Sequence, residues 1–220
     1  MAQIFPRAAD TWLRIGTLLC VCAAALLGIA GWTRVRSPYE TQQGWVQHQP
    51  VPFSHKHHVA DAGIDCRYCH SSVETSAHAG LPATHVCMTC HSQLWAGAEV
   101  LAPVRESLAT GRPLVWHRVA QVPDYVYFNH SIHVARGVAC VECHGRIDTM
   151  PLIQQAKPFQ MQFCIDCHQD PAPHLRPPDK VTQMAPLTWS AAEQRRYGER
   201  VMAAHRIDPK KLVNCEMCHR

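Results

Sequence analysis

Charged and aromatic side chains are scarce in this 220-residue sequence. Only 17% of the residues are charged, 7% are aromatic, and the formal net charge is +4. There is no basic run interleaved with aromatic residues, which is the usual signature of a nucleic-acid-binding surface, so the sequence predicts no nucleic-acid partner. Alternating patterns typical of β-strands are also scarce. The length allows one domain or two small ones.

Cysteine and histidine, in contrast, are abundant, with 12 and 16 residues. Ten of the cysteines form five CxxC pairs, and a histidine follows every pair immediately. The motifs are Cys66, Cys69 and His70; Cys87, Cys90 and His91; Cys140, Cys143 and His144; Cys164, Cys167 and His168; and Cys215, Cys218 and His219. The remaining two cysteines, Cys20 and Cys22, lie in an apolar run and are interpreted as small hydrophobic residues.

The CxxCH motif is the attachment signature of c-type haem. Its two cysteines add to the haem vinyl groups, and the adjacent histidine lies under the iron as the proximal ligand. Structural zinc sites do not require a histidine after every pair, and a thioredoxin-type dithiol would occur once, beside a βαβ pattern. The sequence therefore predicts five covalently bound haem c groups, with the five motif histidines as proximal ligands.

Residues 15–32 form an apolar run without a charge, about the minimum length for a membrane-spanning helix. The alternative is a cleaved signal peptide, with Ala30 before Gly31 as a cleavage site. Arginines on both sides of the run leave its orientation open. Because haem attachment of this type is completed outside the bacterial cytoplasm, we expect residues 1–14 in the cytoplasm, residues 15–32 in the inner membrane, and the haem domain on the periplasmic side.

An internal repeat follows an expected linker at residues 33–52. Unit one (residues 53–91) and unit two (residues 128–168) each begin with F-x-H-x-x-H and then carry two CxxCH motifs. The fifth motif, at residues 215–219, stands alone near the end of the chain. We therefore expect one pentahaem cytochrome domain over residues 53–220.

The paired histidines of the repeat are candidate distal ligands. His55 and His58 are three residues apart, so they share one side of a helical turn. The two axial ligands of one iron must approach from opposite faces, so these two histidines would serve two different haems held close together. His130 and His133 repeat the arrangement. His57, between the first two, is expected to be exposed to solvent.

A fifth distal ligand is not given by the repeat. Met161, three residues before Cys164, is the preferred candidate, because Met/His ligation would raise the potential of one haem above that of bis-His neighbours. Core packing is the alternative role for this methionine. Other candidates are Met150, His85, His117, His174 and His205.

The expected fold is a multihaem cytochrome c of class III-like type, mostly coil with short α-helices around stacked haems. Two longer helices are predicted. One spans residues 98–110 and stops at Gly111, and the other is opened by the capping-box pattern of Ser190 and Glu193 and runs to Arg206. Residues 170–179 are expected to form an extended surface loop.

Three functions compete for a chain of this kind. A multihaem reductase would keep one iron open, but known multihaem nitrite reductases mark their catalytic haem with a motif ending in lysine, and all five motifs here end in histidine. A small tetrahaem quinol dehydrogenase has its first motif close to the anchor, whereas Cys66 lies well beyond Trp32. The pattern favours an electron-transfer subunit without catalytic residues of its own.

The motifs resemble those of one known family, in order and spacing. The segments at 52–95 (PFSHKHHVADAGIDCRYCHSSVETSAHAGLPATHVCMTCHSQLW), 125–152 (YVYFNHSIHVARGVACVECHGRIDTMPL), 161–168 (MQFCIDCH) and 214–220 (NCEMCHR) look like the pentahaem subunit of alternative complex III. The resemblance implies a complex that oxidises menaquinol and passes electrons to a cytochrome c or terminal oxidase. It also implies three kinds of partner: an iron–sulfur subunit related to molybdopterin oxidoreductases, polytopic quinol-binding membrane subunits, and a monohaem cytochrome c. Related subunits occur in other quinone-linked oxidoreductases.

Overall fold

The computed structural model describes residues 4–6 and 8–219, and the chain divides after Gln42 into two compact units. The first unit contains helix α1 (Ala8–Val35) and the short helix α2 (Pro38–Thr41). No described side chain of α1 is buried, and the apolar window of this helical span has a mean hydropathy of 2.1. The helix is long and apolar enough to cross a membrane, which is compatible with membrane anchoring.

Helix α1 is longer than the predicted anchor at 15–32, because helical hydrogen bonding continues through the polar flanks at both ends. At the N-terminal flank, Arg14 pairs with Asp10 one turn earlier, at 2.9 Å. Parts of the expected cytoplasmic segment 1–14, namely residues 1–3 and 7, lie outside the described residues.

The structure also differs from the expected linker at 33–52. Residues 33–35 complete α1, α2 follows, and residues 43–52 belong to the second unit. The Gly44 amide donates to the Gln155 carbonyl at 2.8 Å, and the Gln43 side chain donates to the Ala156 carbonyl at 2.9 Å. Val51 packs with Leu101 and Val104 in a small apolar cluster. The glutamines and the valine of this segment thus make specific contacts instead of forming a free connection.

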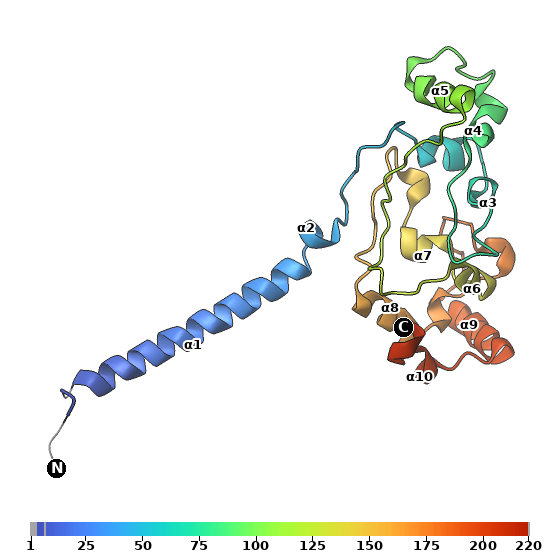
Figure 1. The fold of residues 1–220 in the computed structure, drawn as a ribbon. Coiled ribbons are helices and arrows are strands. Elements are labelled where there is room, and N and C mark those ends of the chain that lie inside the picture. Colours follow the sequence, from blue (N-terminus) through green and yellow to red (C-terminus); the bar gives the residue numbers. More distant parts are fainter. Residues whose placement is uncertain (1–3, 7, 220) are drawn as a thin grey trace. The chain divides into compact units, whose positions relative to one another are not determined.

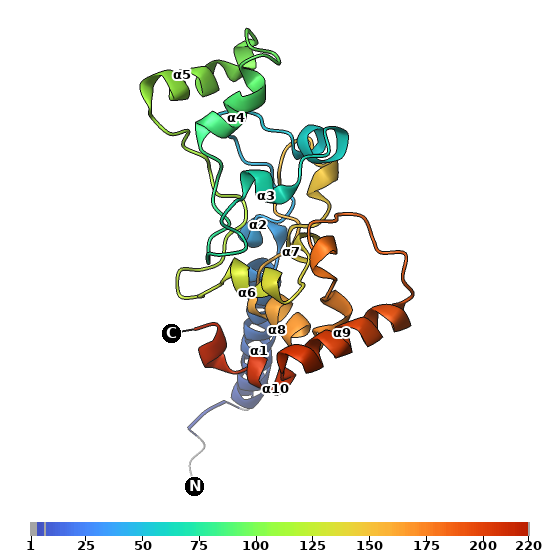
Figure 2. The same cartoon turned by 90° about the vertical axis from the view of Figure 1, so that its right-hand side faces the viewer.

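The second unit is built from short helices joined by coil (Figures 1 and 2). Its α-helices are α3 (Cys66–Cys69), α4 (Thr84–His91), α5 (Ala102–Thr110), α6 (His130–Ala135), α7 (Cys140–His144), α8 (Met161–Gln169), α9 (Ala191–His205) and α10 (Pro209–Leu212). One turn is π-helical, η1 (Lys56–Asp61). The 3-10 turns are η2 (Glu99–Leu101), η3 (Ile147–Thr149), η4 (Ala172–His174), η5 (Pro178–Lys180) and η6 (Cys215–Met217). Among the described residues, extended pairing is limited to isolated bridges, which confirms the predicted class of short helices and coil.

The apolar core that the polypeptide itself supplies is small. The buried hydrophobic residues of the described chain are Val51, Val73, Leu101, Val104, Ala139, Ala172, Leu175, Val181 and Met184. A domain of this length normally buries a much larger apolar interior. This deficit fits the expectation that large apolar cofactors complete the core.

Both longer helices form, although the helix predicted from residue 98 begins as the 3-10 turn η2 and is α-helical only from Ala102. Helix α5 ends at Gly111, which adopts a left-handed conformation with φ 67°, and α9 begins with a complete capping box between Ser190 and Glu193. The expectation of a surface loop at 170–179 is wrong. Ala172 and Leu175 are buried, and the Arg176 amide donates to the Gly137 carbonyl at 2.7 Å, because these apolar residues pack under α9 and beside the turn at Gly137.

Candidate haem-binding site

Four of the CxxC pairs lie within helices, on α3, α4, α7 and α8, and the fifth begins on η6, with Cys215 as its first residue and Cys218 directly after its end. Residues three apart on a helical turn lie on the same side, so each turn presents its two thiols together. At α3 the turn is capped by Asp65, whose carboxylate accepts a hydrogen bond from the Arg67 amide at 2.9 Å. The local sequence thus favours a helical turn at this motif.

A phenylalanine fixes each pair of candidate distal histidines. The Phe53 ring lies edge-on to His55, with centroids 4.9 Å apart, and stacks on His58 at 4.3 Å. Phe128 repeats both contacts, at 4.7 Å to His130 and 4.6 Å to His133. The two repeat units therefore share an arrangement in which a single aromatic ring contacts two imidazoles.

The structure pairs these histidines with motif histidines at a characteristic separation. Ring centroids are 6.1 Å apart for His58 and His91, 6.3 Å for His130 and His144, and 6.1 Å for His133 and His168. A metal–imidazole bond of about 2.0–2.1 Å on each side, plus about 1 Å from nitrogen to ring centre, gives a separation of about 6 Å. Each pair thus leaves the space that one metal ion with two axial imidazoles requires.

For His55 and His70, the relevant observations are burial and electrostatic influence. Burial, followed by the neighbouring His70, lowers the pKa of His55 to about 4. Burial, followed by His130 and His70, likewise lowers the pKa of His144 to about 4, and burial lowers the pKa of His133. These imidazoles are therefore neutral at physiological pH, which is the protonation state that metal ligation requires.

Backbone carbonyls orient most of these rings. Among the motif histidines, the Nδ1 atoms of His70, His91, His168 and His219 lie 2.7–3.2 Å from the carbonyl oxygens of Gly80, Leu94, Leu212 and Tyr125. Among the distal candidates, the Nδ1 atoms of His58, His130 and His133 lie 2.7–2.8 Å from the carbonyl oxygens of Ser54, Ala77 and Asn129. An Nδ1–H that donates to a carbonyl leaves Nε2 unprotonated, with its lone pair available for iron.

Electrostatic interactions between cysteines indicate that the five motifs follow one another in a row. Motif two lies near motif one, since Cys87 adds to burial in raising the pKa of Cys69. Motif one meets motif three, since the Cys66 thiol donates a hydrogen bond to the Cys140 sulfur, and this bond, together with burial, raises the pKa of Cys66. The row continues to motif four, because burial and the thiols of Cys167 and Cys164 raise the pKa of Cys143 to about 12.

The last step of the row leads to motif five, since burial and Cys218 raise the pKa of Cys164. In space, the motifs thus follow one another in the order two, one, three, four, five. Helices α4, α3, α7 and α8 follow one another in this order down the second unit, toward the C-terminal end, in both views (Figures 1 and 2).

The two repeat units interlock at the middle of this row. The backbone amide and Nδ1 of His130 both meet the Ala77 carbonyl, at 3.2 and 2.8 Å, in the loop that separates the first two motifs. Conversely, the Lys56 amide donates to the Met150 carbonyl at 3.1 Å, in the loop that separates motifs three and four. Each repeat unit therefore contacts the segment of the other unit that carries the two candidate distal histidines.

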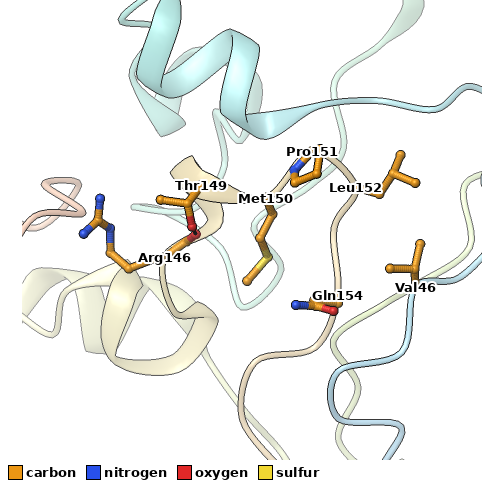
Figure 3. Close-up of a pocket in the computed structure, with 7 residues that line it drawn as sticks. All are labelled: Val46, Arg146, Thr149, Met150, Pro151, Leu152 and Gln154. Atoms are coloured by element: carbon orange, nitrogen blue, oxygen red, sulfur yellow. Dashed lines mark hydrogen bonds between the residues drawn. The ribbon is translucent and has the colours of Figure 1, made fainter.

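Met150 also lines a cavity of about 440 Å³ (Figure 3). The other lining residues are Val46, Arg146, Thr149, Pro151, Leu152 and Gln154. The Arg146 guanidinium is held by Asp148, with two hydrogen bonds of 2.7 Å. The Met150 carbonyl accepts a hydrogen bond from the amide of Lys56, which is next to His55 in the chain. This methionine therefore lies near the segment that carries His55 and His58.

Around motif five, the chain places Met161 near the cysteines. Met161 is the first residue of α8 and 67% exposed, one turn before Cys164, which interacts with Cys218. Of the other candidates, His174 instead contacts Glu142 Oε2 through Nδ1 at 2.8 Å, and His85, His117 and His205 are exposed. His57 is exposed and pairs with Asp61 at 2.8 Å, as predicted.

Sequence reasoning missed two components of the site. The carbonyl acceptors of Nδ1 carry no sequence signal, because every residue has a carbonyl group. The ring contacts of Phe53 and Phe128 did have a signal, since phenylalanine opens both copies of the F-x-H-x-x-H pattern.

No family model matches the chain. A similar protein is the "Menaquinone reductase, multiheme cytochrome c subunit" of Nitratidesulfovibrio vulgaris (strain Hildenborough). It is 31% identical over 172 residues, which cover 78% of this chain and 67% of that protein. Together with the attachment motifs, this similarity means that the chain carries covalently bound haem c and belongs to the family of this multihaem cytochrome c subunit.

Proposed function

We propose that this chain is a membrane-anchored pentahaem cytochrome c that carries electrons along a row of five sites within a quinol-oxidising respiratory complex. The supporting observation is the order of the motifs, two, one, three, four, five, which follows from the electrostatic influence of the cysteines of each motif on those of the next and from the hydrogen bond between Cys66 and Cys140. Each iron alternates between ferric and ferrous states and so holds one electron at a time. The polypeptide keeps neighbouring sites close enough for electrons to hop between them.

The proposed axial ligands follow from the histidine pairs. We assign His55 with His70, His58 with His91, His130 with His144, and His133 with His168. For motif five we assign His219 with Met161, supported by the link between Cys164 and Cys218 and by a thioether that is exposed at this position. Carbonyl acceptors at Nδ1 keep most of the imidazoles in the tautomer that binds iron.

This ligand set favours an electron conduit over a reductase. A reductase needs an iron with one open position, whereas the paired histidines would fill both axial positions of four irons and Met161 would fill the fifth. Reduced protein is therefore expected to bind little carbon monoxide and to show low-spin spectra. Tight binding of carbon monoxide to one haem of the intact protein would support the reductase instead.

We place the chain in the inner membrane of a bacterium, with α1 as the anchor and the haem domain in the periplasm. The proposed complex is of the alternative complex III type, with an iron–sulfur subunit related to molybdopterin oxidoreductases, polytopic quinol-binding subunits, and a monohaem cytochrome c or terminal oxidase as acceptor. The resemblance of the motif segments supports this assignment, and the apolar helix near the N-terminus supports the anchor.

A second candidate is electron delivery to menaquinone. It is favoured by the similarity to a subunit whose name states menaquinone reductase. The two candidates differ in the direction of electron flow: menaquinol reduces the haems in the first, and menaquinone oxidises them in the second.

The test uses the complex purified in mild detergent from membranes of the native host. Mass spectrometry should show five haem masses on this chain, and the companion subunits should copurify. Rapid mixing with a menaquinol analogue should reduce the haems, and oxidised cytochrome c should reoxidise them. If the analogue leaves the haems oxidised, while its quinone form oxidises prereduced haems, the second candidate replaces the first. A chain that copurifies with no partner would refute both.

A further inference from the structure

The proximal histidine of motif two is oriented differently from the others that contact a carbonyl. Its Nδ1 lies 3.0 Å from the carbonyl oxygen of Leu94, only three residues further along the chain. His70, His168 and His219 instead meet carbonyls 10, 44 and 94 residues away. In those three cases tertiary packing fixes the acceptor. At His91 the acceptor carbonyl is instead positioned by a short local turn.

That turn depends on an unusual residue. Trp95, directly after Leu94, has a φ of 56°, which is the left-handed region that bulky side chains rarely adopt. This angle describes rotation about the N–Cα bond of Trp95, and the Leu94 carbonyl belongs to the rigid peptide group on the N-terminal side of that bond. The orientation of the carbonyl relative to the following chain is therefore set by the strained angle. The turn is closed by the Ala98 amide, which donates to the Trp95 carbonyl at 2.9 Å.

Burial of the tryptophan ring does not explain this strain. The Trp95 side chain is 70% exposed, and its ring lies beside His91, with centroids 6.3 Å apart. Backbone strain without a packing gain is characteristic of functional positions. The pattern recurs at Phe159, which has a φ of 49° and lies 6.3 Å from the ring of His144.

We propose that Trp95 is a positioning residue for the haem of motif two: its left-handed backbone aims the Leu94 carbonyl at Nδ1 of His91 and so sets the potential of that haem. The inference rests on the proposed ligation of iron by His91. A hydrogen bond from Nδ1–H to a carbonyl makes the imidazole a stronger electron donor, which favours the ferric state. Motif two is one end of the row, so this turn would tune the haem at which electrons enter or leave.

The test compares substitutions that differ in their tolerance of a left-handed backbone, in full-length protein matured in its native host. Trp95→Val, with a β-branched side chain, should break the turn. The reduction equilibrium of one haem should then shift about tenfold toward the ferrous state, which is about 59 mV upward for a one-electron couple. Trp95→Gly and Trp95→Asn tolerate the left-handed region and should retain the potential of the unmodified protein. Leu94→Ala, which keeps the carbonyl, should also retain it.

Redox titration followed by electron paramagnetic resonance provides the readout. The relevant signal is the one that disappears in a His58→Met variant, because His58 is the proposed partner of His91. An unchanged potential in Trp95→Val, or an equal shift in Trp95→Gly, would overturn the inference. Absence of haem from the peptide that contains Cys87 and Cys90, by mass spectrometry of the unmodified protein, would instead refute the proposed function.

Discussion

The imidazole rings of His130 and His144 lie 6.3 Å apart, centroid to centroid, and are within 6° of parallel. The two residues come from different helices, α6 and α7, and His130 is fixed from outside both by the Ala77 carbonyl. The pair thus combines a separation that suits one iron with a ring orientation imposed by the other repeat unit. This relationship leads to the first prediction.

Replacing His130 by alanine should open one axial position. The haem of motif three would lose its sixth ligand, so we expect a high-spin signal and binding of about one carbon monoxide per reduced chain, measured by optical titration. His57→Ala is the matched control, because that histidine is exposed and pairs only with Asp61 among the described contacts. Equal carbon monoxide binding by the two variants would contradict the assignment of His130.

The planes of the ligand pairs predict distinct magnetic spectra. The rings of His58 and His91 are twisted by 63°, whereas those of His133 and His168 differ by only 19°. Twisted imidazole planes leave two iron d orbitals close in energy, which increases the largest g value of a ferric low-spin haem. We therefore expect the signal that vanishes in His58→Met to have a larger g value than the signal that vanishes in His133→Met. The reverse result would contradict the pairing.

Gly198 should resist replacement by alanine, although it lies inside helix α9. A Cβ at this position would collide with the backbone of Ala172, in η4. Helix propensity alone favours alanine by about 1 kcal/mol, but overpacking costs about 1–3 kcal/mol, so the net effect should be destabilising. Denaturant unfolding of Gly198→Ala measures this. The control is Gly97→Ala, where an added Cβ meets nothing within 4 Å. A stabilised Gly198→Ala would contradict the close contact.

Asp65 should make stability depend on acid pH. Hydrogen bonds from the Arg67 side chain, above all, lower the pKa of Asp65 from 3.8 to about 2, and the Thr182 hydroxyl also donates to it. A carboxyl with a lowered pKa in the folded state stabilises the fold at pH values above its unfolded pKa. This contribution should therefore be lost as the pH falls from about 4 through about 2.

Thermal unfolding between pH 6 and pH 1.5 tests this dependence. Asp65→Asn should lower the melting temperature at pH 6 and should flatten its fall below pH 4. Asp124→Asn, at an exposed position, serves as the control and should follow the unmodified protein. An identical acid profile for Asp65→Asn and the unmodified chain would exclude this carboxyl as the cause.

The local features of this protein were predictable from sequence. The CxxCH motifs, the apolar run that lies in α1, the capping box of Ser190 and Glu193, and the stop of α5 at Gly111 each depend on residues a few positions apart. Their physics is short-range: side chains three or four apart share a helical face, a hydroxyl caps its own helix, and glycine tolerates a positive φ. The repeat also predicted that His130 and His133 repeat the arrangement of His55 and His58. The phenylalanine contacts do match, although the first segment is a π-helical turn and the second an α-helix.

The relationships between distant segments came only from the tertiary structure. The sequence did not reveal which candidate distal histidine faces which motif, that His130 contacts the Ala77 carbonyl, or that Ala172 is buried against Gly198 of α9. The spatial order of the five motifs could not be read from the sequence either. Motif one meets motif three through Cys66 and Cys140, although motif two lies between them in the chain. These arrangements depend on non-covalent contacts between segments tens of residues apart, and such contacts are decided by the packing of the whole domain.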